Sequence, residues 1–80
     1  MNSTEMMRRE ILRLAEATRR SAFINTGRLS AFYNVPERNV RQELAKLADE
    51  KVIRLAGWQS KEQFLANAAE GSAVRIDLVD

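Results

Sequence analysis

Residues 29–47 read Leu29-Ser-Ala-Phe-Tyr-Asn-Val-Pro-Glu-Arg-Asn-Val-Arg-Gln-Glu-Leu-Ala-Lys-Leu47 and contain two helical patterns separated by a short turn. Asn34 tolerates the left-handed conformation in which helices commonly end. Pro36 disfavours helical geometry at Val35 but suits the first turn of a new helix, where its missing N–H group would be unpaired anyway. The stretch therefore predicts a helix, a turn and a second helix.

Each of these two predicted helices has one apolar face, with spacings of three, four and seven residues. The faces consist of Leu29, Phe32 and Tyr33 before the turn and of Val40, Leu44, Leu47 and Ala48 after it. We expect Leu29, Tyr33, Val40, Leu44 and Leu47 to join Ile11 and Leu14 of an earlier helix in one buried cluster.

The remaining elements follow from the periodicity of the flanking residues. A stripe at helical spacing predicts a first helix that ends near Arg20, and it consists of Met7, Ile11, Leu14, Ala15 and Thr18. Residues 22–24 suit a very short strand, and Thr26 can cap the helix before the turn. The helix after the turn is expected from Pro36 to about residue 49 or 50.

The pattern changes from helical to alternating after Glu50, which predicts strands at 51–58 and 73–79 that pair as a hairpin. The connection between them is longer than an ordinary hairpin loop, so we expect it to contain a helical turn. Ser60 and Gln63 form a capping-box pattern at its start, and Gly71 is suited to end a helix.

The composition bounds the function. The chain has 80 residues and a net charge of +2, and it contains neither Cys nor His. Disulfides, thiolate nucleophiles, imidazole bases and the usual zinc ligands are therefore excluded, and we expect no catalytic residue, cofactor or metal site. No apolar run has the length of a signal peptide or a membrane span, so a cytoplasmic protein without a membrane partner is expected.

The charges are distributed unevenly along the chain. Residues 1–46 contain nine Lys or Arg against five acidic residues, whereas residues 47–80 contain four against six. A polarised field of this kind favours an anionic partner, but a solvated surface accounts for the charge equally well. For the arginines of the first helix we favour the solvated surface, because Glu5 with Arg9 and Glu16 with Arg20 form i, i+4 pairs that stabilise an exposed helix.

The order of these elements resembles that of the winged helix-turn-helix family. Leu29-Ser30-x-x-Tyr33-Asn34-Val35 is similar to the Leu-Ala-x-x-Leu-Gly-Val of GntR-like bacterial repressors, and Asn39-Val40-Arg41-x-x-Leu44-x-x-Leu47 is similar to their Thr-Val-Arg-x-x-Leu-x-x-Leu. Val52-Ile53-Arg54 stands where their first wing strand begins. The resemblance implies a single α+β domain over residues 1–80, with a three-helix core and a C-terminal β-hairpin wing. The helix-turn-helix would cover about 26–50 and the wing about 51–79.

This resemblance implies a bacterial transcription regulator that binds double-stranded DNA in a sequence-specific way, with the helix after the turn in the major groove. Arg, Asn and Gln have the forked side chains that read guanine and adenine edges, and Lys holds phosphates. The expected DNA-binding residues are Arg28, Arg38, Asn39, Arg41, Gln42 and Lys46, with Lys61 in the wing. A homodimer or a protein partner remains open.

Two acidic residues depart from the family pattern. Glu37 would face phosphates unless it pairs with Arg38 or Arg41, and Glu43 stands where the family prefers a small or apolar residue. DNA binding therefore depends on whether Arg28, Arg38, Arg41 and Lys46 form one positive face that these carboxylates do not interrupt.

The alternative function is a winged helix that docks another protein through the segment that begins at Trp58. Trp58, Phe64 and Leu65 would serve as interface anchors, because large apolar side chains are frequent at such sites. Trp58 and Phe64 are also suited to close a small hydrophobic core beside the first helix, which is the arrangement we favour.

Overall fold

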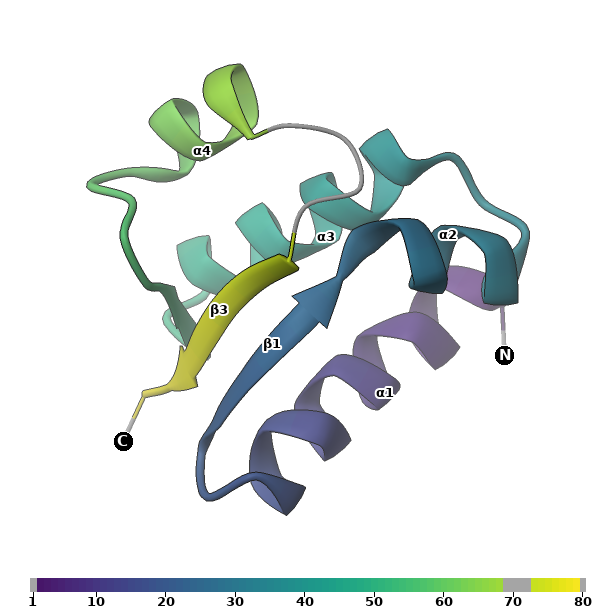
Figure 1. Ribbon diagram of the computed structural model, residues 1–80, viewed down its shortest axis with the longest axis horizontal. Coiled ribbons are helices and arrows are strands. Elements are labelled where there is room, and N and C mark those ends of the chain that lie inside the picture. The colour runs from purple at the N-terminus through teal and green to yellow at the C-terminus, as the bar shows by residue number, and fades with distance from the viewer. Residues whose placement is uncertain (1, 69–72, 80) are drawn as a thin grey trace.

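The computed structural model of the chain describes residues 2–68 and 73–79. Within these ranges the fold is α+β, with four helices and a three-stranded antiparallel sheet in the order β1-β3-β2 (Figure 1). One side of the sheet packs against the helices, since α1 contacts β1 and β3 while α3 contacts β2. No helix in the described part of the chain is long and apolar enough to cross a membrane.

Helix α1 covers Ser3–Ala17. Asn2 caps its N-terminus, and the Asn2 side chain accepts a hydrogen bond from the Glu5 N–H at 2.9 Å. The helix ends three residues before the predicted Arg20. Arg19 and Arg20 have φ angles of 61° and 72°, and this left-handed backbone turns the chain into the sheet. Neither Gly nor Asn marks this helix end, so no local signal predicted it.

The two helices predicted on either side of the turn are present. Helix α2 covers Thr26–Tyr33 and α3 covers Glu37–Asp49, and Asn34 between them is left-handed with φ 54° and ψ 47°. The cap of α2 differs from the prediction, because the Asn25 side chain accepts from the Arg28 N–H at 2.9 Å. This leaves the Thr26 hydroxyl for a contact with α3.

The predicted strand before α2 exists and is longer than expected. Strand β1 covers Ser21–Asn25 and pairs with β3, Ala73–Leu78, while β2, Ile53–Leu55, pairs with the other side of β3. The hairpin pairing of β2 with β3 is therefore confirmed, although β2 is much shorter than residues 51–58. Strand β3 lies between the other two, so the C-terminal strand holds the sheet together.

The long connection contains α4, Lys61–Asn67, as the capping pattern predicts. The Ser60 hydroxyl accepts from the Gln63 N–H at 3.1 Å, and the Gln63 side chain accepts from the Gln59 N–H at 2.7 Å. Phe64 is fully buried in the same core cluster as Met7 and Ile11 of α1, and Trp58 packs against that cluster. Helix α4 itself packs against α3. The predicted role of Gly71 lies outside the described residues.

The core largely matches the predicted cluster. Ile11, Leu29, Val40, Leu44 and Leu47 are buried together, and Leu14 and Tyr33 pack against them half-buried. Two side chains contradict the helical pattern. Phe32 is exposed, with its ring edge-on to Tyr33, and Ala45 is buried although it lies outside the apolar face predicted for this helix.

Candidate nucleic-acid interface

Helix α3 presents a polar stripe on the side away from the core. Arg38, Gln42 and Lys46 are exposed and stand four residues apart, so their side chains follow one another along a single face. Asn39 lies beside them and is half-buried. All four were predicted DNA-binding residues, and α3 brings them to one surface.

Glu37, the first residue of α3, turns away from this stripe. Its Oε1 atom accepts a hydrogen bond from the buried Thr26 hydroxyl at 2.6 Å, and the same oxygen lies 3.9 Å from Nη1 of Arg41. The Thr26 contact ties the start of α2 to the start of α3. The carboxylate is therefore held inside the helix-turn-helix rather than toward an outside phosphate.

Arg41 does not face outward as the sequence predicted. Its side chain is only 12% exposed, because it lies along the face of α3 on which Glu37 stands one turn earlier. Its Nη1 atom is buried and has no hydrogen-bond partner among the residues that the structure describes. Arg41 is thus a structural partner of Glu37 in this conformation, and the outward face of α3 retains Arg38 as its N-terminal cation.

Glu43 also leaves the outer face of α3. Its side chain is 5% exposed, and its carboxylate accepts a hydrogen bond from Nη1 of Arg8 at 2.8 Å. Nη2 of Arg8 donates to Glu50, the C-terminal cap of α3. One guanidinium on α1 therefore binds two carboxylates, that of Glu43 within α3 and that of Glu50 at its end. The hydrogen bonds to Glu50 and Glu43 raise the pKa of Arg8.

Sequence reasoning missed this ion pair because Arg8 and Glu43 are 35 residues apart. A signal was present, however. Glu43 stands three residues after Val40 and one before Leu44, which places it within the apolar spacing of α3. A carboxylate at such a position needs a cation from another element, since a buried unpaired charge is strongly unfavourable.

Lys61, the predicted wing residue, lies beside the α3 stripe. Its Nζ atom is 2.9 Å from Oδ1 of Asp49, and this contact raises the pKa of Lys61. A groove between α3 and α4 is lined by Gln42, Lys46 and Lys61, and also by the exposed Leu65. The structure thus brings Lys61 to Gln42 and Lys46, with its charge engaged by a neighbouring carboxylate.

Arg28 lies in a different groove, between α1 and α2. It is exposed, and the residues that share its groove include Glu10 and Phe32 rather than the α3 stripe. The predicted face of four cations is therefore reduced. Arg38 and Lys46 share one stripe, Arg41 is turned inward, and Arg28 belongs to a neighbouring groove.

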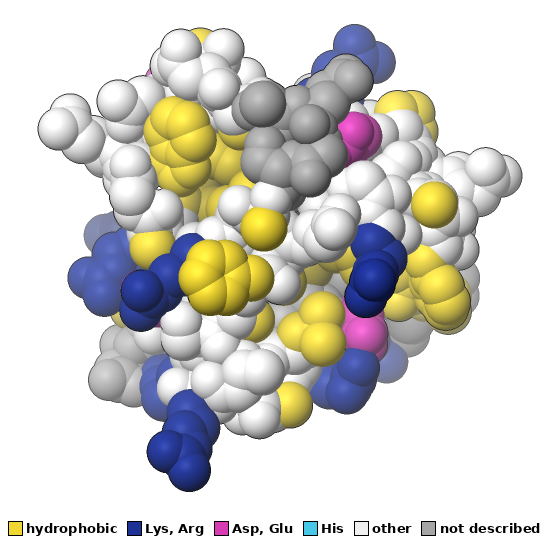
Figure 2. All heavy atoms as spheres, viewed as in Figure 1, with side chains coloured by type: hydrophobic (Ala, Val, Ile, Leu, Met, Phe, Trp, Pro, Cys, Tyr) yellow, Lys and Arg dark blue, Asp and Glu magenta, His cyan; other side chains and the backbone are white. Residues whose placement is uncertain are grey.

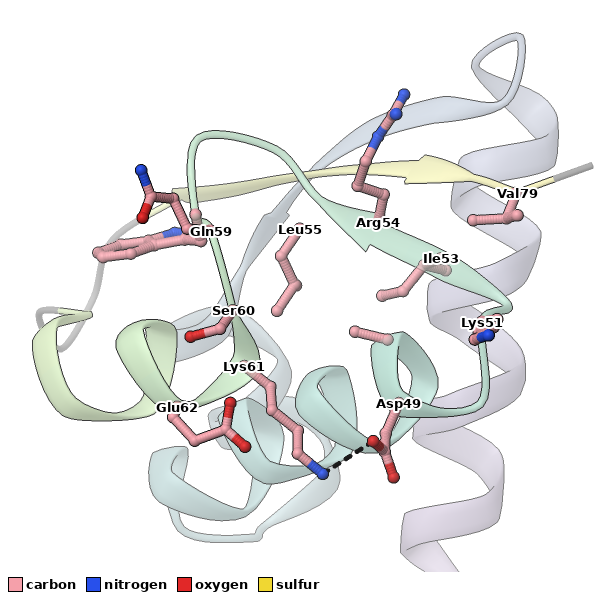
Figure 3. Close-up of a pocket in the computed structure, with 12 residues that line it drawn as sticks. Asp49, Lys51, Ile53, Arg54, Leu55, Gln59, Ser60, Lys61, Glu62 and Val79 are labelled. Atoms are coloured by element: carbon pink, nitrogen blue, oxygen red, sulfur yellow. Dashed lines mark ion pairs between the residues drawn. The ribbon is translucent and has the colours of Figure 1, made fainter.

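A further pocket, which the sequence did not predict, lies where the end of α3, strand β2 and the start of α4 meet (Figure 3). The apolar side chains of Ile53 and Leu55 point into it, and the ion pair of Lys61 with Asp49 lies at its lower side. The described residues include no group of three or more acidic side chains suited to a metal ion.

Comparisons with known proteins give no relative from which a function can be transferred. No family model, no curated protein and no solved structure matches the chain.

Proposed function

We propose that this chain is a winged helix-turn-helix domain that binds double-stranded DNA in a sequence-specific way through the outer face of α3. The observation that carries the proposal is the placement of charge on that helix. Arg38, Gln42 and Lys46 are exposed on one stripe, whereas Glu37 and Glu43 are held by contacts on other sides of α3. A surface of this kind attracts phosphates and carries side chains that read base edges.

The order of the elements supports the assignment to a winged helix. Helix α1, strand β1, the α2–α3 pair and the β2–β3 hairpin follow one another as the family resemblance implies. Helix α4 occupies the connection of that hairpin and packs against α3. On this proposal the wing is a short helix that flanks the recognition helix, rather than an extended loop.

The proposed roles differ between the residues of the stripe. Arg38 and Gln42 read base edges, because a guanidinium suits guanine and an amide suits adenine. Lys46 holds a phosphate and thereby sets the position of the helix in the groove. Arg41 supports the helix-turn-helix through Glu37 and makes no base contact. A net charge of +2 is small for a DNA-binding domain, so pairing of two copies on a two-fold site would strengthen binding.

The competing function, docking of another protein through the α4 region, has weaker support. Phe64 is buried in the core, and Trp58 is half-buried with its ring 5.7 Å from the Phe64 ring in an edge-on contact. Of the three anchors that the sequence suggested, Leu65 alone is exposed. One exposed leucine is ordinary for a protein surface.

The test is selection of bound sequences from a random duplex pool, followed by titration of the enriched duplex at two salt concentrations. We expect enrichment of a defined sequence and an affinity that falls steeply with salt as counterions are released. Arg38→Ala should cost about 1–3 kcal/mol and relax the preference at one base pair. Lys46→Ala should weaken all sequences alike and flatten the logarithmic salt slope by about 0.9.

The matched control is Arg9→Ala, which removes one exposed cation from α1 and should leave both the preference and the affinity for the enriched duplex nearly unchanged. If no sequence is enriched and no duplex binds at low salt, the proposal fails and protein docking takes its place.

A further inference from the structure

The sheet has an outer face that the proposed duplex-binding role does not use. Alternation along the strands directs Ala22, Ile24, Val74 and Ile76 toward the helices, so the residues between them face outward. Helix α3 packs on the inner side, so the outer face lies on the opposite side of the sheet from α3 (Figure 1). The described residues on this face are Ser21, Phe23, Asn25, Arg54, Ala73, Arg75 and Asp77.

Phe23 is the single large apolar side chain among these residues, and it is 72% exposed. It stands directly across from Arg75 in the β1–β3 register. Arg54 lies on β2, opposite Asp77. Figure 2 shows the same side of the molecule, with Lys and Arg side chains beside a hydrophobic side chain over the sheet.

The two arginines lie near one carboxylate, that of Asp77. The Ser21 hydroxyl donates to Oδ1 of Asp77 at 2.7 Å, Nε of Arg75 lies 3.5 Å from the same oxygen, and Nη2 of Arg54 lies 3.8 Å from Oδ2. Arg75 makes its contacts through Nε, and within residues 2–68 and 73–79 its two terminal nitrogens have no hydrogen-bond or ion-pair partner. Asp77 thus lies within ion-pair distance of both guanidinium groups, and both arginine side chains remain largely exposed on the outer face.

More cations lie at the end of the sheet where β1 and β2 begin and β3 ends. The Leu78 N–H donates to the carbonyl of Arg20, and the Val79 N–H donates to the carbonyl of Val52. Arg19 and Arg20 therefore precede β1, and Lys51 precedes β2, at the same end; all three are exposed. The outer face itself thus carries Arg54 and Arg75 against Asp77, and Arg19, Arg20 and Lys51 add three cations at this end of the sheet.

We propose that the outer face of the sheet is a second binding surface, which takes single-stranded DNA or RNA with one base stacked on Phe23 and the adjoining phosphates held by Arg54 and Arg75. The combination of an exposed aromatic ring with flanking arginines suits an unpaired strand, because every base has a face that can stack and every linkage carries a charge. Duplex DNA does not suit it, since bases within a duplex already cover one another's faces. An acidic protein would use the arginines but has no need of the ring.

The test is fluorescence anisotropy with the full chain and labelled twelve-nucleotide strands of deoxythymidine and of uridine, at low salt. We expect both strands to bind, and the tighter one identifies the preferred sugar. Phe23→Leu should weaken binding by about tenfold, because it keeps an apolar side chain but removes the stacking face. Arg75→Gln should also weaken binding and reduce its salt dependence.

Arg9→Gln on α1 serves as the control and should bind like the parent chain, and circular dichroism checks that each variant is folded. The inference is overturned if neither strand binds at low salt, or if Phe23→Leu binds as tightly as the parent. It is also overturned if an unlabelled duplex of equal length displaces the strand as well as unlabelled single strand does. Binding of a labelled polyglutamate peptide that depends on Arg54 and Arg75 but not on Phe23 would assign the surface to an acidic protein instead.

Discussion

Replacement of Arg8 by Ala tests whether α1 neutralises the carboxylate buried in α3. The substitution removes the guanidinium that lies 2.8 Å from Glu43, and it leaves a carboxylate that is 5% exposed without a charged partner. Loss of one member of a fully buried pair costs about 3–5 kcal/mol. Because the Arg8 side chain is 30% exposed, water reaches this site, and we expect a smaller loss of about 1–3 kcal/mol.

Such a loss is large for a chain of this length, whose total stability is about 4–12 kcal/mol. Each kcal/mol should lower the melting temperature by about 4–8 °C, so thermal unfolding followed by circular dichroism will resolve it. Glu43→Gln added to Arg8→Ala should restore part of the stability, since a neutral amide is less costly to bury than a charge. The reasoning is refuted if Arg8→Ala has the same melting temperature as the control variant Arg9→Ala, or if adding Glu43→Gln restores none of the lost stability.

Three further predictions concern the core, the helix-turn-helix and the sheet. Leu44→Ala removes a fully buried side chain and should cost about 2–5 kcal/mol in urea unfolding; an unchanged midpoint would show that the inward face of α3 is misassigned. Thr26→Val keeps the side-chain shape but removes the hydrogen bond to Glu37, and should lower stability by about 1.5–3 kcal/mol; a melting temperature equal to the parent's would contradict that role. The hydrogen bond from Ser21, together with Arg75 and Arg54, lowers the pKa of Asp77 in the folded chain. As the pH falls, Asp77 is therefore protonated at a higher pH in the unfolded chain than in the folded one. Its contribution is present above about pH 4 and is lost as the pH falls through the folded-state value, so urea midpoints measured from pH 7 downward should decline more for the parent than for Asp77→Asn.

The features that were predictable from the sequence have local causes. The turn between α2 and α3 depends on Asn34 and Pro36, and the start of α4 depends on the pair of Ser60 with Gln63. Each signal acts within a few residues, so no knowledge of the fold was needed. The alternation in β3 is equally local, and the predicted strand is correct to within one residue.

The features that were not predictable depend on which elements meet. Ala45 is buried and lines the groove that α4 forms against α3, and the position of α4 has no local signature. Phe32 has the spacing of a core residue but lies at the margin of an eight-residue helix, where Leu29 takes the buried position. Arg41 was expected to face outward from α3, yet its side chain is largely buried and its Nη1 atom lies 3.9 Å from Glu37 one turn earlier.

The same distinction applies to the candidate interface. The sequence identified Arg38, Gln42 and Lys46 correctly as outward residues of α3. It did not show how the two acidic residues are placed, because their partners Thr26 and Arg8 belong to other helices. Those two contacts decide whether the outer face of α3 is open to an anionic partner, and they follow from the tertiary structure alone.

The most direct test of duplex binding by α3 is a titration of the nitrogen-15-labelled chain with the duplex enriched from the random pool, followed by NMR. We predict that the amide signals of Arg38, Asn39, Gln42 and Lys46 shift most, with smaller shifts along the facing side of α4. Signals of Phe23 and Arg75 on the outer face of the sheet should remain in place. Shifts confined to the sheet, or no shift at low salt with a fully folded chain, would contradict the account.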